Sequence, residues 1–219
     1  MIFFPVAFLI FIAFLLFLPV LFIFGYFQIV ILGFEKLGIS SGMTIFILLA
    51  ILIGSAVNIP LTKKKLIYVR ERRFFGLWQT PKVEARGIAV NLGGAVIPIL
   101  LSFYFLFLTL KLGFELKPIL IATLLMIVIS KFLARVVPGR GISLSAIIPP
   151  VFSAIFAMIL APAFSAPAAF ISGTLGVLIG ADILNLKRAW KFGGFISIGG
   201  AGVFDGIFLV GIISALLAP

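Results

Sequence analysis

Two aspartates, Asp182 and Asp205, are the only ones in the chain, and each lies in a long apolar, glycine-rich stretch. A carboxylate at the centre of a membrane helix costs about 2.5–3.5 kcal/mol on insertion scales, so an intramembrane aspartate marks a candidate functional site. Two of them on neighbouring apolar segments strengthen that interpretation. We therefore take Asp182 and Asp205 as the candidate catalytic pair.

If the two carboxyl groups meet in a low dielectric, they share one proton, because both do not ionise a few ångströms apart. The ionised aspartate can then take a proton from water while its protonated partner donates to a carbonyl oxygen. This chemistry hydrolyses a peptide bond without a cofactor. It suits a chain with no histidine and no cysteine, which lacks the commonest general base, the commonest transition-metal ligand and any thiol. We expect neither a cofactor nor a metal site.

The elements that must position the pair are two consecutive apolar segments. Asp182 lies five residues before Lys187, about 7 Å inside the end of its predicted helix, and Asp205 lies nine residues after Ile196, about 13 Å along the next. The short connection makes the two helices antiparallel neighbours. Glycines four residues apart allow close helix packing around each aspartate. The residues expected to support the site or bind substrate are Gly180, Asn185, Gly200, Gly202, Gly206 and Asn91.

Composition places the whole chain in a bilayer. Its 219 residues are 63% hydrophobic with a mean hydropathy of +1.39, against about 45–50% apolar residues in soluble domains. We predict an all-α polytopic integral membrane protein, a single transmembrane domain over 1–219, with kinked or broken segments at Gly and Pro. About seven transmembrane helices are placed at 3–32, 42–61, 87–110, 117–136, 143–164, 167–186 and 196–217. Pro149-Pro150 is expected to break the first turns of the fifth.

Basic residues predict the orientation. Seven alternating spans divide the 17 Lys and Arg residues into fourteen on one side and three, Lys36, Lys111 and Lys117, on the other. By the positive-inside rule the N-terminus is cytoplasmic and the C-terminus lies outside. The basic cytoplasmic loop at about 62–86 mixes basic and aromatic residues, and we interpret it as a segment that binds anionic lipid rather than nucleic acid.

Other interpretations of the aspartates stay open. Buried aspartates also hydrogen-bond helix ends, Asn185 or a lysine such as Lys131, and they form proton or cation relays in transporters. A weak repeat favours transport: Arg86-Gly87-Ile88 recurs as Arg140-Gly141-Ile142, each followed by a proline about ten residues later. A proton- or ion-coupled transporter or channel is therefore the alternative function.

The run from Asn91 to Pro98, with Gly93 and Gly94, also has two interpretations. It could be an unwound segment that exposes backbone groups to an extended substrate. It could instead be tight packing around small residues, with Asn91 capping a helix or bonding across helices.

The stretch Gly200-Ala-Gly-Val-Phe-Asp205-Gly-Ile-Phe-Leu-Val-Gly211 resembles the Gly-x-Gly-Asp span of presenilins, signal peptide peptidases and prepilin peptidases. The resemblance implies an intramembrane aspartyl protease, a hydrolase that cleaves a membrane-inserted protein or peptide, with Asp182 as the other catalytic aspartate. The motif departs from the pattern, because Val203-Phe204 stand where glycine directly precedes the aspartate and Ala181 replaces the usual aromatic residue.

As a whole, the chain resembles a prokaryotic membrane family known as the domain of unknown function sixteen-fourteen. The matching pieces are Asn91-Leu-Gly-Gly-Ala-Val-Ile-Pro98, residues 141–150, and Gly180-Ala-Asp-Ile-Leu-Asn-Leu186 with the Asp205 motif. This resemblance implies an integral membrane protein of a prokaryotic cell and brings no activity with it.

Overall fold

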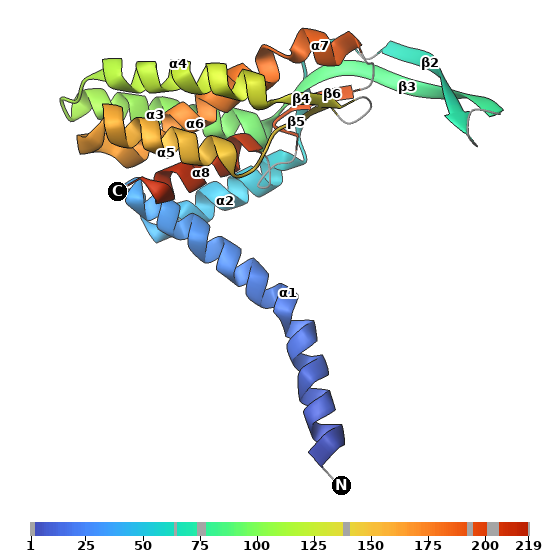
Figure 1. Cartoon of the computed structure of the whole chain (residues 1–219), viewed down its shortest axis with the longest axis horizontal. Helices are drawn as coiled ribbons and strands as arrows, with labels where there is room; N and C mark the ends of the chain where they lie inside the picture. The colour runs from blue at the N-terminus through green and yellow to red at the C-terminus, as the bar shows by residue number, and fades with distance from the viewer. Residues whose placement is uncertain are drawn as a thin grey trace.

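The computed structural model describes residues 3–63, 65–73, 78–137, 141–191, 195–200 and 206–218, and side chains within these ranges except at 3–5, 65–73, 78–85 and 206. Most of these residues are helical (Figure 1). The apolar helices are α1 (Phe3–Lys36), α2 (Ser41–Ser55), α3 (Ile97–Lys111), α4 (Leu116–Leu133), α5 (Ile148–Leu160), α6 (Ser165–Val177) and α8 (Gly206–Leu217). Helix α7 (Leu186–Lys191) is short and basic.

Four helical segments are long and apolar enough to cross a membrane: Val6–Lys36, Leu92–Lys111, Leu116–Leu133 and Pro162–Lys191. These segments are consistent with an integral membrane protein. The other apolar helices, α2, α5 and α8, have 15, 13 and 12 residues and reach only about 18–23 Å. Since a bilayer core is about 30 Å thick, seven complete crossings stay a prediction.

A small sheet closes one end of the helical bundle, so the chain is mostly helical but not all-α. Strand β3 (Trp78–Asn91) pairs with β2 (Lys65–Arg73) over its first part. Its last residues pair with β1 (Asn58–Pro60) antiparallel on one side and with β6 (Phe195–Ile198) parallel on the other. A second ladder, β4 (Arg135–Val137) with β5 (Gly141–Ser143), lies at the same end (Figure 1).

These strands correct three predicted span boundaries. The second span ends at Ser55 rather than 61, the third begins at Leu92 rather than 87, and the helix of the seventh begins at Gly206 rather than 196. Residues 58–60, 87–91 and 195–198 pair between strands instead of within a helix. Along 87–91 buried and half-buried residues alternate, which is the period of two of a strand with one face packed.

The prolines at the start of α5 do not break it. The helix begins at Ile148, so Pro149 and Pro150 lie in its first turn. The backbone N–H that proline lacks has no helical partner there anyway, and the fixed φ of proline suits the first turn. The break expected in a longer helix is therefore a helix start.

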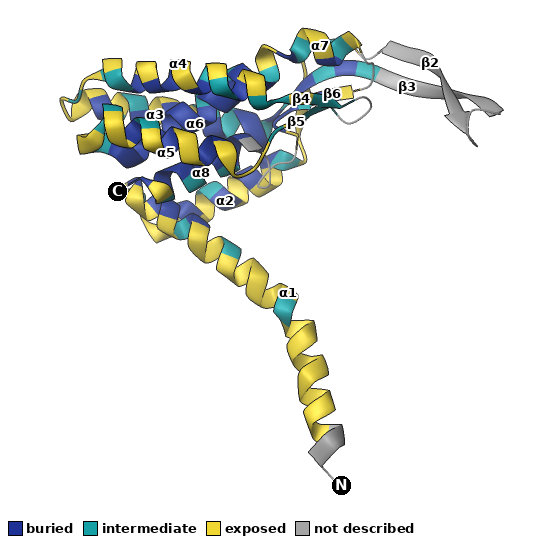
Figure 2. Cartoon of the chain, in the orientation of Figure 1, coloured by how far each residue is buried: buried dark blue, intermediate teal, exposed yellow. Residues whose placement is uncertain are grey.

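Helix α6 lies at the centre of the bundle, in contact with α3, α4, α5 and α8 (Figure 2). Every residue of α6 except Leu175 is buried. Small residues make this possible: a Cβ on Gly176 would lie 2.4 Å from the Cβ of Met126 on α4. Close packing of this kind holds membrane helices together where lipid gives no hydrophobic driving force.

The two ends of the bundle differ in charge. The sheet end holds Arg86, Lys131, Arg135, Lys187, Arg188 and Lys191, and the opposite end holds Lys36, Lys111 and Lys117 (Figure 1). At that opposite end, Lys36 Nζ donates to the carbonyl oxygens of Leu216 (2.9 Å) and Ala218 (2.7 Å), which joins the end of α1 to the end of α8. A cation is stabilised there by the unpaired carbonyls of a helix C-terminus.

Candidate functional site

Asp182 lies in η3 (Leu178–Ile183), a π-helical continuation of α6 at the sheet end. It is half-buried, between the fully packed Ala181 and the exposed Ile183. π-helical turns are rare and occur often at functional sites, because the extra residue redirects side chains. The carboxyl group of Asp182 therefore stands where the buried helix α6 reaches the surface of the bundle.

The widened turn is fixed from both sides. A Cβ on Gly180 would lie 2.3 Å from the carbonyl oxygen of Ile127 and 2.9 Å from Ser130 Cβ, so α4 contacts the backbone of η3 directly. The buried side chain of Asn185 donates to the carbonyl oxygens of Gly180 (3.2 Å) and Ala181 (3.0 Å). Leu184 N–H bonds Ile179 O at 2.9 Å, five residues back. Asp182 thus sits on a backbone that its neighbours hold in place.

Asp205 and Gly202 lie outside the described residues, so the separation of the two carboxyl groups stays a prediction. The residues on either side are described. Ile207 in α8 and Ala181 in η3 belong to one buried apolar cluster, together with Ala95 and Ile198. The segments next to both aspartates therefore pack on the same core. The estimate of 13 Å along a helix from Ile196 is wrong, because 195–198 form strand β6.

Asn91 is the centre of a polar network at the sheet end. It is fully buried; its Oδ1 accepts from Gly94 N–H (2.8 Å), and its Nδ2 donates to Ser55 O (2.7 Å) and Asn58 Oδ1 (3.3 Å). The same Asn58 oxygen accepts from Ser197 Oγ on β6 (2.5 Å). One buried amide therefore connects α2, β1, β3 and the π-helical segment η1 (Leu92–Val96) that precedes α3.

Gly93 and Gly94 are close-contact positions within η1. A Cβ on Gly93 would lie 2.1 Å from Ile51 O in α2, and one on Gly94 would lie 2.0 Å from Gly199 O. Gly199 itself has φ +68°, a left-handed conformation that favours glycine. Gly200, expected at the site, follows it in the same turn. Tight packing with Asn91 as cap accounts for this geometry. The turn at Gly199 and Gly200 therefore packs tightly against η1.

Sequence reasoning missed Asn58 and Ser197, because Asn58 falls inside the predicted span 42–61 and Ser197 at the start of the predicted span 196–217. The alternation of β-branched and small residues in Ile88-Ala89-Val90 was the signal that could have revealed the strands. Arg86 also has a structural role. Its Nη2 donates to Trp190 O (2.5 Å) and its guanidinium lies 4.4 Å from the Trp190 ring centroid, which holds α7 against β3.

Two further candidate positions can be placed. Lys131, considered as a partner for an aspartate, is exposed in the last turn of α4. Gly206 is the first residue of α8. Within the described ranges, no three acidic side chains are placed to hold a metal ion.

The chain matches a known protein family over most of its length. The family described as Protein of unknown function (DUF1614) matches residues 52–217, which include both aspartates, Asn91 and the sheet. No curated protein and no solved structure matches the chain. The resemblance to presenilin-type proteases therefore rests on the sequence around the two aspartates alone. Because the match covers well over half of its length, the chain belongs to the DUF1614 family.

Proposed function

We propose that this protein is an intramembrane aspartyl peptidase in which Asp182 and Asp205 form the catalytic pair and no cofactor takes part. The observation that carries the proposal is the presentation of Asp182: a half-buried carboxyl group on a π-helical turn fixed by Gly180 and Asn185. Preorganised groups of this kind lower the cost of reaching the transition state. The packing of Ala181 and Ile207 in one cluster supports a short distance between the two aspartates.

The proposed reaction needs only water and the two carboxyl groups. The ionised aspartate removes a proton from water as the water oxygen attacks the peptide carbonyl carbon, and the protonated aspartate donates its proton to the carbonyl oxygen. The aspartate that took the proton from water then gives it to the nitrogen as the C–N bond breaks, while one hydroxyl of the tetrahedral intermediate returns its proton to the other aspartate as the C=O bond re-forms. A carboxyl group and an amine leave. The pair ends with one proton between its members, as it began.

The sheet end is the proposed place of cleavage. Basic side chains of α7 and the ends of α4 and β4 gather there, as they do where a membrane protein meets the cytoplasm of a prokaryotic cell. With the N-terminus cytoplasmic and the C-terminus outside, water reaches Asp182 from the cytoplasmic face. Anionic lipid headgroups would bind the basic segment at 62–86. The substrate is a membrane-inserted protein or peptide.

The test uses the full chain in lipid nanodiscs and a set of fluorogenic peptides with one apolar span. Wild type should cleave, and Asp182→Asn and Asp205→Asn should each lose at least about a thousandfold in kcat/KM, with no further loss in the double variant, because the two groups act as a unit. Glu115→Gln, a carboxyl change at the opposite end, is the control and should retain activity. Cleavage in H₂¹⁸O should place one heavy oxygen in the new carboxyl group. Retained cleavage in either aspartate variant would overturn the proposal.

A proton or ion relay is the second candidate, and one observation favours it. Buried hydroxyl groups from three helices meet near Gly173: Ser153 and Ser172 lie 2.9 Å apart, and Ser214 Oγ lies beside them. Thr174 Oγ1, also buried, faces Gly211 of α8. Thr174 Oγ1 has no hydrogen-bond partner among the described residues, and Thr174 precedes Asp182 by eight residues, about 12 Å along the helix. Proton flux into liposomes that falls in both Asp182→Asn and Thr174→Val, without peptide cleavage, would favour transport.

A further inference from the structure

Helix α1 is packed differently from the other spans. None of its most apolar 18-residue window is buried, whereas 67% of the corresponding window in Pro162–Lys191 is buried. Only its last turns join the bundle, where Val30 and Phe34 belong to the core with Phe208 of α8. Figure 2 shows α1 from Val6 onward as mostly exposed helix that approaches the bundle at an angle. A long stretch of α1 is therefore open to a partner within the membrane.

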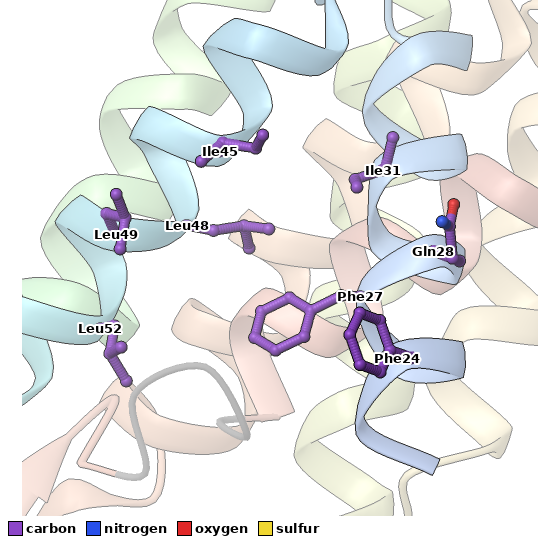
Figure 3. A pocket seen from close by; sticks show the side chains of 8 residues that line it. All are labelled: Phe24, Phe27, Gln28, Ile31, Ile45, Leu48, Leu49 and Leu52. Carbon is purple, nitrogen blue, oxygen red and sulfur yellow. The ribbon is translucent and has the colours of Figure 1, made fainter. Parts of the chain in front are cut away.

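An apolar groove separates α1 from α2 (Figure 3). Phe27 and Ile31 of α1 face Leu48 of α2 across it, and the space between holds about 300 Å³. That volume suits a side chain or part of an acyl chain, but a whole helix about 10 Å across does not fit into it. Gln28 lies on α1 at the margin of the groove, and its amide is not directed at the labelled side chains of α2.

Gln28 is the residue that needs an explanation. Its side chain is exposed and makes no hydrogen bond with any described residue. It precedes Lys36 by eight residues, about 12 Å along the helix, which places the amide well inside an apolar layer. Lipid chains offer an amide neither donor nor acceptor, so an unpaired amide at this depth costs free energy. The missing partner must come from outside the described chain.

The surface around Gln28 forms one stripe. Leu21, Gly25, Gln28 and Leu32 are spaced by four, three and four residues, so they share a face of α1, and all four are exposed. We call these four residues the Gln28 face. No atom lies within 4 Å of the position a Cβ on Gly25 would take, so a second helix can approach the backbone there. Small residues beside a polar one are typical of helix contacts in membranes.

We infer that the Gln28 face binds the same face of a second copy of this chain. A carboxamide carries both donors and an acceptor, so two Gln28 side chains related by a two-fold axis satisfy each other. An acyl chain fills the groove but leaves the amide unpaired. A polar membrane protein of another kind would need matching groups at the same depth, whereas the second copy supplies them by symmetry. The dimer does not depend on the proposed peptidase activity.

Cysteine cross-linking tests the inference cleanly, because the chain has no cysteine of its own. Leu21→Cys and Leu32→Cys are introduced singly into the full chain, with Ile23→Cys as matched control. Ile23 is 57% exposed, so a random encounter in the membrane reaches it as well as the other two positions. It lies on the opposite side of α1, so contact through the Gln28 face does not bring two copies of it together. A short bifunctional maleimide in native membranes should give dimers from Leu21→Cys and Leu32→Cys and few from Ile23→Cys.

Gln28→Leu in the Leu32→Cys background then removes the polar pair at a lipid-exposed site where folding is not at risk. Dimerisation should weaken about three- to thirty-fold, the range of a polar contact between membrane helices, and Gln28→Asn should restore most of it. Equal cross-linking at Ile23→Cys would overturn the inference and assign the face to lipid. So would unchanged dimers in Gln28→Leu. Cross-links to other proteins in place of the dimer would assign the face to a different partner.

Discussion

The two π-helical segments, η1 and η3, contain the same residue types in different roles. Each has glycine backbone pressed against a neighbouring helix and an asparagine that bonds its carbonyls or N–H groups. In η1, Asn91 and the two glycines are fully enclosed and the segment carries no charge. In η3, Gly180 and Asn185 hold a turn that carries the half-buried Asp182.

The difference teaches that a distorted helix is not by itself a site. η1 is distorted because it must fit between α2 and the Gly199 turn, and the amide of Asn91 at its start is hydrogen-bonded to Gly94, Ser55 and Asn58. η3 is also held by its neighbours, but its last residues face outward and include an ionisable group. An ionisable side chain on a rigid, half-exposed turn is what distinguishes η3, the candidate site, from η1, whose distortion serves packing alone.

The largest expected effect comes from adding a methyl group to the glycines. Gly94→Ala should destabilise the fold by about 3 kcal/mol or more, because its Cβ would overlap the carbonyl oxygen of the buried Gly199. Gly180→Ala should cost less, because Ile127 O can move away from the new Cβ as α4 shifts as a unit. Thermal unfolding followed by tryptophan fluorescence in detergent measures both.

Gly42→Ala is the control, since nothing lies within 4 Å of its Cβ position in α2, and it should be neutral or stabilise by up to about 1 kcal/mol. If Gly180→Ala were the more damaging change, η3 and not η1 would be the tighter packing site, and the comparison would be reversed.

The next largest effect distinguishes the roles of the two asparagines, Asn91 and Asn185. Asn91→Ala removes three hydrogen bonds from a fully buried amide and should cost about 2–4 kcal/mol, whereas Asn185→Ala removes two bonds to local carbonyls and should cost about 1–2 kcal/mol. For peptidase activity we expect the reverse order, with the larger loss in Asn185→Ala, because Asn185 holds the turn that carries Asp182. Equal losses of cleavage in variants that remain folded would contradict the separation of roles.

The smallest effect tests how far each network extends. Ser197→Ala should cost about 1 kcal/mol, since it removes one bond to Asn58. In a double-mutant cycle Ser197→Ala should couple with Asn91→Ala by about 0.5–1 kcal/mol and be additive with Asn185→Ala. Coupling with Asn185→Ala instead would mean that the two π-helical segments act as one network.

The helices were predictable and the sheet was not. Long apolar runs between charges located α1, α3, α4 and α6, because the bilayer allows little else. The segment Phe195–Ile198 was predicted wrongly, as the place where a helix begins, because four apolar and small residues before a glycine run are compatible with a helix start as well as with a strand. Its pairing with β3 is parallel and joins residues more than a hundred positions apart, which no local pattern reveals.

The candidate site was predictable in part. Asp182, Gly180 and Asn185 followed from the rarity of charge in apolar sequence and from glycine spacing, and they lie together in space. Asn58 and Ser197 did not follow, because a hydroxyl and an amide 139 residues apart have no shared signal until the strands bring them together. The meeting of Asp182 with Asp205 stays a prediction.

The bond from Lys36 to the end of α8 also bears on how the chain is made. Residues 180 positions apart form it, so at about 5–20 residues per second the ribosome delivers the second partner roughly 10–40 seconds after the first. During that interval α1 stays in the bilayer without the helix that will cover Phe34. Biogenesis of this protein therefore includes a stage in which α1 has only lipid and the earlier-made α2 beside it, and a membrane chaperone that shields apolar helices would act at that stage.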